Sequence, residues 1–375
     1  MNRGFYLTLM MGGFKASPVP EPVIEALAEV TVSSTVGAQG GFQMKFTLGR
    51  NSVIQQMLSA GKFDPRQRVI IAVTVNGSTE VLMDGIITRQ DLSPSSVAGK
   101  STLSITGLDL TALMDFIDLT GIPYPALPEF VIVEAILAKY AVLGVVPLAL
   151  PASIPTFENP LERFIKQQGT DYHFVTTLAR NTGAVFYLDP GTTPGKSLAY
   201  WGPDLSKMFG GPQPALSINL DASTNLDSIS FSYDGTLATQ YLVTIIEPNT
   251  KIPIPIPVPN IDLIKAPLAA NAPTPLRSQQ LKPVANENPA GAALAGLAAM
   301  FQTADVISAS GQLDVLRYGQ VFKARQLAAV RGAGSYYDGK YYVKSVTHSI
   351  KRGEFKQSFT LSRGGTGSSI STVSI

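Results

Sequence analysis

The sequence contains no cysteine, only two histidines and one tryptophan among 375 residues, and only 15% charged residues. Without cysteine, neither disulfides nor cysteine-ligated metal sites can form. The 29 basic and 27 acidic residues nearly cancel to a formal charge of +2. This balance argues against a protein that binds nucleic acid by massed phosphate contacts, so we expect no stable nucleic-acid binding. Apolar residues make up 45% of the chain, enough for the cores of two or three domains.

No apolar run in the sequence has the length and continuity of a membrane-spanning segment. Phe5–Met11 is shorter than the apolar region of a signal peptide and lacks a cleavage site, so we interpret it as a strand. The stretch Val142–Leu150 is interrupted by Gly144 and Pro147. We therefore expect a soluble protein without membrane insertion. The absence of cysteine fits assembly in a reducing cytoplasm.

Residues that commonly perform catalysis are few and scattered. His173 lies in a candidate helix and His348 in a candidate strand, and neither has a second histidine three or four residues away. The sequence has no Gly-x-Ser-x-Gly elbow and no phosphate loop that ends in Gly-Lys-Ser/Thr. Two pairs of nearby carboxylates are more typical of a solvated helix face than of a glycosidase site, namely Asp115 with Asp118 and Glu158 with Glu162. We predict no catalytic, cofactor-binding or metal-binding residue.

Residues 1–112 have the pattern of a small β-barrel. Apolar and polar residues alternate over Phe42–Leu48, the period of a half-buried strand. Arg68–Val75 is a β-branched run that ends at the turn Asn76-Gly77, and Val81–Thr88 follows as in a hairpin. Several short strands at this spacing predict a first β-barrel domain.

Residues 113–215 change to helical spacing and predict a small α/β insertion. Gly183 is a natural C-terminal stop for the last helix, because glycine adopts the left-handed conformation readily. The segments with helical spacing are Leu110–Ile117, Val131–Tyr140, Leu161–Gln168 and one that runs from a cap at Thr170 or Asp171 through Asn181.

Residues 216–365 return to the β pattern and predict a second β-barrel domain. Leu226–Tyr233 and Thr239–Ile246 are expected to be strands joined through Asp234-Gly235. Tyr341–Ile350 and Glu354–Ser362 are expected to form the closing hairpin.

A Pro/Ala-rich connector at about 250–310 interrupts the second barrel. In Ile252–Pro259, proline at every second position removes every second backbone donor, so we expect an extended surface segment and not a central strand. The Ala-rich stretch Pro289–Ala309 is predicted to be helical, and the Gly/Ser/Thr-rich tail 366–375 is expected to be flexible. The predicted fold class is therefore α+β and β-rich, with two similar β-barrel domains flanking a small α/β insertion. No tandem repeat is evident, so the similarity of the barrels rests on the strand pattern alone.

Three groups of motifs follow one another along the chain. They are Gly107-Leu108-Asp109-Leu110-Thr111-Ala112-Leu113, then Asp171-Tyr172-His173-Phe174-Val175 with Asn181-Thr182-Gly183, then Tyr318-Gly319-Gln320-Val321 with Val346-Thr347-His348-Ser349-Ile350 and Phe359-Thr360-Leu361-Ser362-Arg363. In this order they resemble the phage late control protein D family. That family comprises baseplate hub proteins of contractile tails and contractile injection systems, related to the hub of T4-like baseplates and to the N-terminal part of type VI secretion spike proteins.

The resemblance implies a structural subunit and not an enzyme. Three copies with two similar barrels each would form a homotrimeric ring of six quasi-equivalent barrels, which joins a sixfold inner tail tube to a threefold central spike. The implied partners are the inner tail tube protein, a central spike protein and other baseplate proteins, within a phage tail or a contractile injection particle. The needle-like domain fused in some relatives has no counterpart here, so we expect a separate spike protein. The Ile-Pro run and the Ala-rich stretch do not map onto the family pattern.

Three other classes of protein remain open. A tube-like or distal tail protein would form rings of six copies where a hub forms rings of three. A secreted glycan hydrolase or peptidase would need a positioned acid–base pair. A glycan-binding or receptor-binding β protein would need clustered exposed aromatic residues, whereas Trp201 and Tyr200 lie beside Pro203, which favours packing or an interface.

Overall fold

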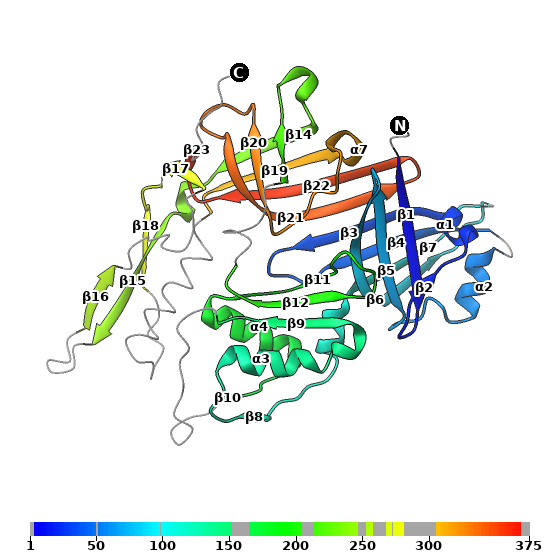
Figure 1. The fold of residues 1–375 in the computed structure, drawn as a ribbon, viewed down its shortest axis with the longest axis horizontal. Coiled ribbons are helices and arrows are strands. Elements are labelled where there is room, and N and C mark those ends of the chain that lie inside the picture. The colour runs from blue at the N-terminus through cyan, green and yellow to red at the C-terminus, as the bar shows by residue number, and fades with distance from the viewer. Residues whose placement is uncertain are drawn as a thin grey trace.

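The fold consists of two groups of β-strands and a small α/β unit (Figure 1). The predicted β-rich α+β class is confirmed. Within the described residues, no helix is long and apolar enough to cross a membrane. The computed structural model describes residues 4–49, 52–97, 99–151, 165–204, 213–246, 253–257, 268–271, 273–280 and 305–368.

The first group of strands, which we call module 1, is an antiparallel sheet. The turn Asn76-Gly77 joins its fourth and fifth main strands, and both residues have positive φ (49° and 84°), as the preferred two-residue hairpin turn requires. The short helices α1 (Glu21–Ala26) and α2 (Val53–Ser59) pack against each other beside the sheet. The strands are β1 (Phe5–Gly12), the short edge strand β2 (Ser17–Pro18), β3 (Leu27–Thr35), β4 (Gly41–Leu48), β5 (Arg68–Val75), β6 (Ser78–Ser93) and β7 (Ser101–Asp109).

The second group, module 2, lies above module 1 in the view of Figure 1. Its last two strands form the closing hairpin predicted from the sequence, with a turn at Arg352-Gly353. The strands are β13 (Gln213–Ser217), β14 (Leu226–Tyr233), β19 (Ile307–Asp314), β20 (Leu327–Arg331), β21 (Gly339–Lys351) and β22 (Glu354–Arg363), with the short helix α7 (Val315–Tyr318) after β19.

The two modules have the same order of strands. Hydrogen-bonded neighbours follow the order β1-β5-β6-β7-β4-β3 in module 1 and β13-β20-β21-β22-β19-β14 in module 2. If the strands of each module are ranked by their place in the chain, leaving out the short β2, strands of the same rank occupy the same position in both orders. A short helix precedes the fourth strand in both modules, α2 before β5 and α7 before β20. One difference is that β1 and β5 are antiparallel, whereas β13 and β20 are parallel.

Two irregularities recur in both sheets, although the shift between Ile71 and Ala72 in the pairing of β5 with β6 has no counterpart in that of β20 with β21. The pairing of β6 with β7 shifts register between Ile87 and Arg89, and that of β21 with β22 shifts between Val343 and Ser345. A second shift lies at the start of β3 and recurs at the start of β14. Since β-bulges are specific features of a strand pair, their recurrence indicates that the modules are equivalent strand for strand and in register.

The modules share one sheet and one core. β21 pairs with β3, which joins both groups into a sheet of thirteen strands. A single cluster of buried apolar side chains extends through both modules, and the rings of Phe5 and Phe355 lie 5.5 Å apart at centroids across the joint. The two modules therefore fold as one body.

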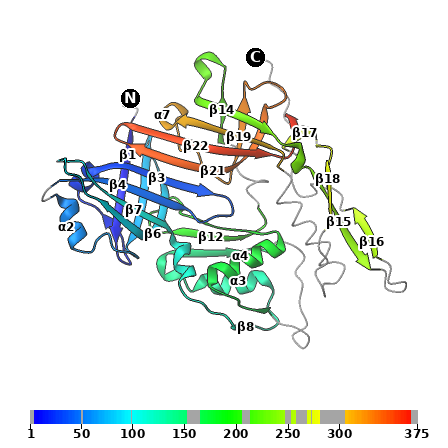
Figure 2. The same cartoon turned by 180° about the vertical axis from the view of Figure 1, so that it is seen from behind.

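The α/β insertion lies between β7 and β13, below module 1 in Figure 1 and seen from behind in Figure 2. Its core packs around Trp201 and includes Ile86 of module 1. α4 begins after Thr170, whose hydroxyl accepts the N–H of His173, and ends at Gly183 (φ 70°), as predicted. Its elements are η1 (Leu110–Asp115), β8 (Pro123–Tyr124), α3 (Glu129–Ala138), η2 (Ala141–Leu143), β9 (Val145–Ala149), β10 (Ile165–Lys166), α4 (Asp171–Thr182), β11 (Val185–Asp189) and β12 (Ser197–Gly202).

Three predictions for single segments need correction. The segment Leu161–Gln168 was predicted to be helical, but Ile165–Lys166 is a strand that pairs with β8; residues 161–164 lie outside the described residues. β14 and β15 (Thr239–Ile246) are strands as predicted but do not form a hairpin, because β14 pairs with β19. The end of the Ala-rich stretch, Ile307–Ala309, belongs to β19, and most of that stretch lies outside the described residues.

The connector carries a small sheet of its own. β16 (Pro253–Pro257), from the Ile-Pro run, is an edge strand beside β15, whose other edge holds β18 (Arg277–Gln280). The prediction that the run is not a central strand is confirmed. β17 (Ala269–Asn271) pairs with β23 (Thr366–Ser368), so the first residues of the expected flexible tail are paired. Two further short helices lie in the described part of the chain, η3 (Asp221–Ser223) and η4 (Gly235–Leu237).

Candidate functional site: the joint between the modules

The joint is formed by the long strand β21, which pairs with two different strands along one of its edges. The first half of β21, up to Tyr342, pairs with β20 of its own module. After the bulge at Lys344, Ser345–Lys351 pairs with β3 of module 1, while the opposite edge pairs with β22. The backbone N–H of Val36 donates to Lys344 O at 2.9 Å, which continues the pairing past the end of β3. The edge of one module is thus covered by the edge strand of the other.

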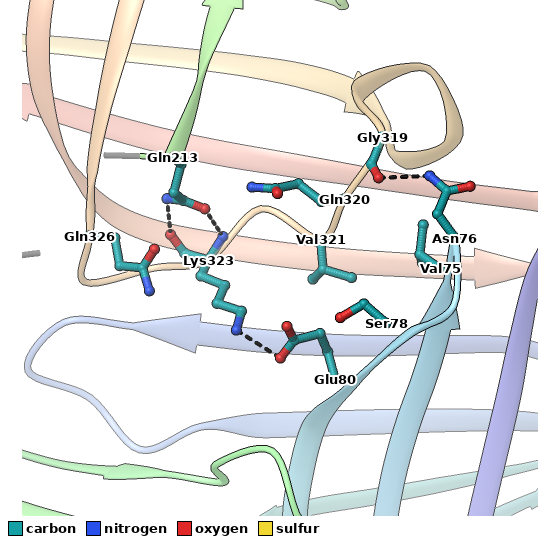
Figure 3. A pocket seen from close by; sticks show the side chains of 10 residues that line it. All are labelled: Val75, Asn76, Ser78, Glu80, Gln213, Gly319, Gln320, Val321, Lys323 and Gln326. Carbon is teal, nitrogen blue, oxygen red and sulfur yellow. Dashed lines mark hydrogen bonds and ion pairs between the residues drawn. The ribbon is translucent and has the colours of Figure 1, made fainter. Parts of the chain in front are cut away.

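A polar cavity of about 530 Å³ lies beside the joint (Figure 3). The Asn76 turn of module 1 forms one side, and the chain between α7 and β20 forms the other. Asn76 Nδ2 donates to Gly319 O at 2.8 Å, and Lys323 Nζ lies 2.7 Å from Glu80 Oε2. Each of these contacts links the two modules, so the polar groups of the cavity hold the joint.

Two glutamine side chains fix the chain between α7 and β20. Gln213 Nε2 donates to Lys323 O at 2.9 Å, and its Oε1 accepts the Lys323 N–H at 2.7 Å (Figure 3). Gln357 holds Phe322, the residue before Lys323, in the same way. Its Oε1 accepts the Phe322 N–H, and its Nε2 donates to Phe322 O. Each glutamine replaces the backbone partners that a neighbouring strand would supply.

His348 is part of this support. Because Gln357 Oε1 already accepts the Phe322 N–H, its Nε2 donates to His348 Nδ1 at 2.9 Å. His348 Nδ1 is therefore an acceptor. Complete burial lowers the pKa of His348 to about 3, so the ring is neutral at physiological pH. The side chain fills the interior beside Phe355 and has a packing role.

A buried ion pair attaches the insertion to module 1. Arg68 Nε and Nη2 donate to the two carboxylate oxygens of Asp84 at 2.8 and 2.7 Å. Arg68 Nη2 also donates to Leu143 O of the insertion at 2.8 Å, and Ser197 Oγ lies 3.5 Å from Asp84 Oδ2. The pair therefore joins β5, β6 and the insertion.

A buried carboxylate closes module 1 where the chain leaves it. Asp109 Oδ2 accepts the Gly40 N–H at 2.6 Å, and Oδ1 accepts the N–H and the hydroxyl of Thr111. Burial raises the pKa of Asp109, although these donors oppose the shift. The residue at the corresponding end of β22 is Arg363, whose guanidinium donates to the carbonyl oxygens of Asp338 and Tyr336. Two of the motifs singled out in the sequence, Gly107–Leu113 and Phe359–Arg363, thus lie where a module ends.

The remaining candidate residues have structural roles. Asp115 accepts a hydrogen bond from Thr170 Oγ1, and Asp118 accepts two from Thr120. Trp201 is buried and donates from its indole Nε1 to Val175 O at 3.3 Å, as expected for packing. His173 is exposed on α4.

Two of the carboxylates, Glu158 and Glu162, lie outside the described residues. In the part of the chain that the structure describes, no group of three His, Asp or Glu residues is arranged to hold a metal ion.

A short sequence repeat, not recognised from the sequence alone, marks the equivalent positions of the modules. Phe63-Asp64-Pro65-Arg66-Gln67 precedes β5, and Phe322-Lys323-Ala324-Arg325-Gln326 precedes β20. Both phenylalanines are fully buried. The shared Phe-x-x-Arg-Gln pattern is the signal that could have revealed the duplication.

Solved structures of phage tail proteins have this fold. A tail protein from Neisseria meningitidis MC58 has a TM-score of 0.62 and 13% identity, with 97% of this chain and 98% of that chain covered. The 43 kDa tail protein of prophage MuSo2 from Shewanella oneidensis has a TM-score of 0.61 and 13% identity, covering 96% and 98%. Comparison of the sequence with protein-family models and with curated proteins gives no match.

A type VI secretion protein also shares the fold. It comes from E. coli, is described as structurally similar to tail proteins of bacteriophage T4, and has a TM-score of 0.55 and 13% identity, with 89% of this chain and 73% of that chain covered. The resemblance seen in the sequence is therefore confirmed at the level of the fold, which is that of phage tail and type VI secretion proteins.

Proposed function

We propose that this chain is the structural baseplate hub of a contractile phage-tail-like particle. Three copies form a ring that joins the sixfold inner tail tube to the threefold central spike. The supporting observation is the presence of two modules with the same strand order, two register shifts at equivalent places and the same helix position in one chain. Three such chains carry six equivalent modules, which is the symmetry match that the role requires.

The proposal includes the division of the chain and its partners. Residues 1–112 and 216–365 are the two barrel domains, 113–215 is the insertion, and 366–375 is the tail. The inner tail tube protein, a separate central spike protein and other baseplate proteins are the partners, and the particle is assembled in the cytoplasm. The hub role needs large β surfaces and no reactive groups, which agrees with the packing roles of His348, Asp109 and the Arg68–Asp84 pair.

The mass of the purified protein tests this proposal. Light scattering should give three times the chain mass of 39.8 kDa. A particle of six chains would favour the tube-like or distal tail alternative. Deletion of the gene should also leave no assembled baseplates on electron micrographs, and intact contractile particles without this protein would refute the hub role.

A further inference from the structure

The α/β insertion carries an open apolar groove of about 470 Å³ between α3 and β9. Both elements belong to the part of the insertion that lies away from module 2 (Figures 1 and 2). Most of the lining comes from α3, and Leu148 and Ala149 of β9 complete the described lining. The groove shares no described lining residue with the cavity at the joint, so it is a separate surface.

The helix α3 is apolar on two opposite faces. The face in the core of the insertion consists of Ile132, Val133, Ile136 and Leu137. The face that lines the groove carries Phe130, Val131, Ala135 and Ala138. A helix with only one buried side normally has polar residues on the other. α3 therefore has the composition of a helix that is covered on both sides.

The open edge of β9 cannot accept a further strand. β9 pairs with β12 on one side and, within the described residues, with no strand on the other. The Ala149 N–H points to the open side, where Glu134 Oε2 accepts it at 2.9 Å. Alternate residues of a strand point their N–H groups to the same side, so Pro147 has the preceding outward position and offers no N–H. Strand addition is thus blocked at this edge.

The side chains of the groove suit a packed helix instead. Ala135 and Ala138 are exposed, and their small side chains allow another helix to approach α3 closely. Phe130 and Leu148, the latter 38% exposed, offer larger apolar surfaces for side chains of the incoming helix. An amphipathic helix that places its apolar stripe in such a groove is a recurrent mode of protein recognition.

One carboxylate sets the charge of the groove. Glu134 is the only charged residue among the described residues that line it. The nearest lysine in the sequence, Lys139, is engaged elsewhere, because its Nζ lies 2.5 Å from Asp171 Oδ2. A lysine or arginine beside the apolar stripe of the incoming helix would complement Glu134.

Within the described residues, a second copy of this chain has no helix of this kind to offer. Besides α3, only α4 among the described helices is longer than seven residues. The apolar residues of α4, such as Phe174 and Leu178, are buried in the core of the insertion. α3 itself carries the acidic Glu129 and Glu134 and would repel a copy of itself. The complementary helix therefore belongs to a different protein.

We propose that the groove between α3 and β9 binds an amphipathic helix of a different protein. Its apolar stripe packs on Ala135 and Ala138, and a basic residue beside the stripe pairs with Glu134. The insertion is then a docking domain, and this role does not depend on the number of copies in the proposed ring.

Two synthetic peptides test the proposal on the full chain. The first is a helical peptide of about 15 residues with leucine at every third or fourth position and lysine beside this stripe. The second has glutamate in place of each lysine. Fluorescence anisotropy of the labelled peptides should show that the lysine peptide binds at least about tenfold more tightly than the glutamate peptide.

Three variants locate the binding to the groove. Ala135→Phe fills the groove and should weaken binding of the lysine peptide at least about tenfold. The matched control is Ala141→Phe, an exposed position outside the described lining, which should leave binding unchanged. Glu134→Gln keeps an oxygen for the Ala149 N–H but removes the charge, so it should abolish the preference for the lysine peptide. Thermal unfolding of each variant verifies that it folds.

The other outcomes overturn the proposal. Absence of lysine-peptide binding, equal binding of both peptides, or undiminished binding by Ala135→Phe contradicts a helix site in the groove. Loss of self-association by mass in Ala135→Phe but not in Ala141→Phe would assign the groove to a second copy. Binding of the natural chain to phosphatidylcholine vesicles that Ala135→Phe alone abolishes would assign it to a lipid surface. None of these results changes the mass of the natural protein, which tests the hub role separately.

Discussion

Arg66 and Arg325 occupy the same position in the two modules. Both have positive φ (74° and 63°), which is uncommon for a residue with a side chain. The N–H of Arg66 donates to Ile87 O at 2.8 Å, and that of Arg325 donates to Val343 O at 2.9 Å, in each case just before the bulge.

Both guanidinium groups also reach the insertion. Arg66 lies over the ring of Phe116 at 5.4 Å and Arg325 over that of Tyr187 at 4.5 Å. Cation–π contacts of this kind stabilise packing at partly exposed sites. The insertion thus braces equivalent points of both modules.

Removing one partner of the buried ion pair should destabilise the protein strongly. Asp84→Ala leaves the Arg68 guanidinium buried without its carboxylate, and the free energy of unfolding should fall by about 3–5 kcal/mol. Chemical denaturation measures this change. The exposed pair Arg89–Asp91 offers the control, since Asp91→Ala should change stability by less than about 1 kcal/mol. Similar losses for both variants would contradict the role assigned to Arg68 and Asp84.

The burial of His348 should make stability depend on pH. Its pKa is lowered to about 3 in the folded protein, whereas a histidine in the unfolded chain titrates near about 6.5, so the unfolded chain binds more protons in between. The contribution is present above about pH 6.5 and is lost as the pH falls, at about 1.4 kcal/mol per pH unit down to about pH 3.

The variant His348→Asn isolates this contribution, because its side-chain oxygen can still accept the Gln357 N–H. Denaturation at several pH values should show a shallower dependence than in the natural protein. The exposed His173 provides the matched control, and His173→Asn should keep the steep dependence. Equal slopes for His348→Asn and the natural protein would show that His348 does not cause the effect.

Gly107 should tolerate no side chain. A Cβ at this position would lie 2.2 Å from Ile86 O and 2.3 Å from Phe42 Cζ. Gly107→Ala should lower the free energy of unfolding by about 1–3 kcal/mol through overpacking. A Cβ added at Gly13 would meet nothing within 4 Å, so Gly13→Ala is the control and should stay within about 0.5 kcal/mol. Unchanged thermal unfolding of Gly107→Ala would refute this prediction.

Gln213 should matter for the joint because it holds the backbone of Lys323. Gln213→Leu leaves the backbone N–H and C=O of Lys323 without their partners, at an expected cost of about 1–3 kcal/mol. The exposed Ser78, in the lining of the same cavity, serves as the control in Ser78→Ala. Denaturation curves compare the two variants, and equal stability would mean that water replaces the glutamine.

Local signals in the sequence predicted most of the elements. The cap at Thr170 and the stop at Gly183 define α4 because both act within a few residues. The turn Asn76-Gly77 likewise defines the hairpin of β5 and β6. These features depend on backbone conformations that neighbouring residues dictate.

Pairing between distant segments could not be predicted in this way. Ile165 lies in a strand only because Tyr124 lies beside it. The partner of β14 arrives at Ile307, beyond the connector, so the turn-like Asp234-Gly235 was mistaken for a hairpin. The candidate site also depends on pairing between distant segments, because no local pattern indicates that β21 changes its partner strand at Lys344. The Phe-x-x-Arg-Gln repeat can be recognised as a duplication only after the strand orders of the two modules have been aligned.

The segment that connects the second and third main strands differs greatly in length between the modules. In module 1 the chain passes from Thr35 to Gly41 through a short turn, whereas in module 2 the whole connector lies between Tyr233 and Ile307. The module architecture therefore accommodates additional domains in this segment without loss of the sheet. The turn at the exposed Gly37, where nothing lies within 4 Å of an added Cβ, is accordingly the place where we would graft a fluorescent label or a foreign domain onto the protein.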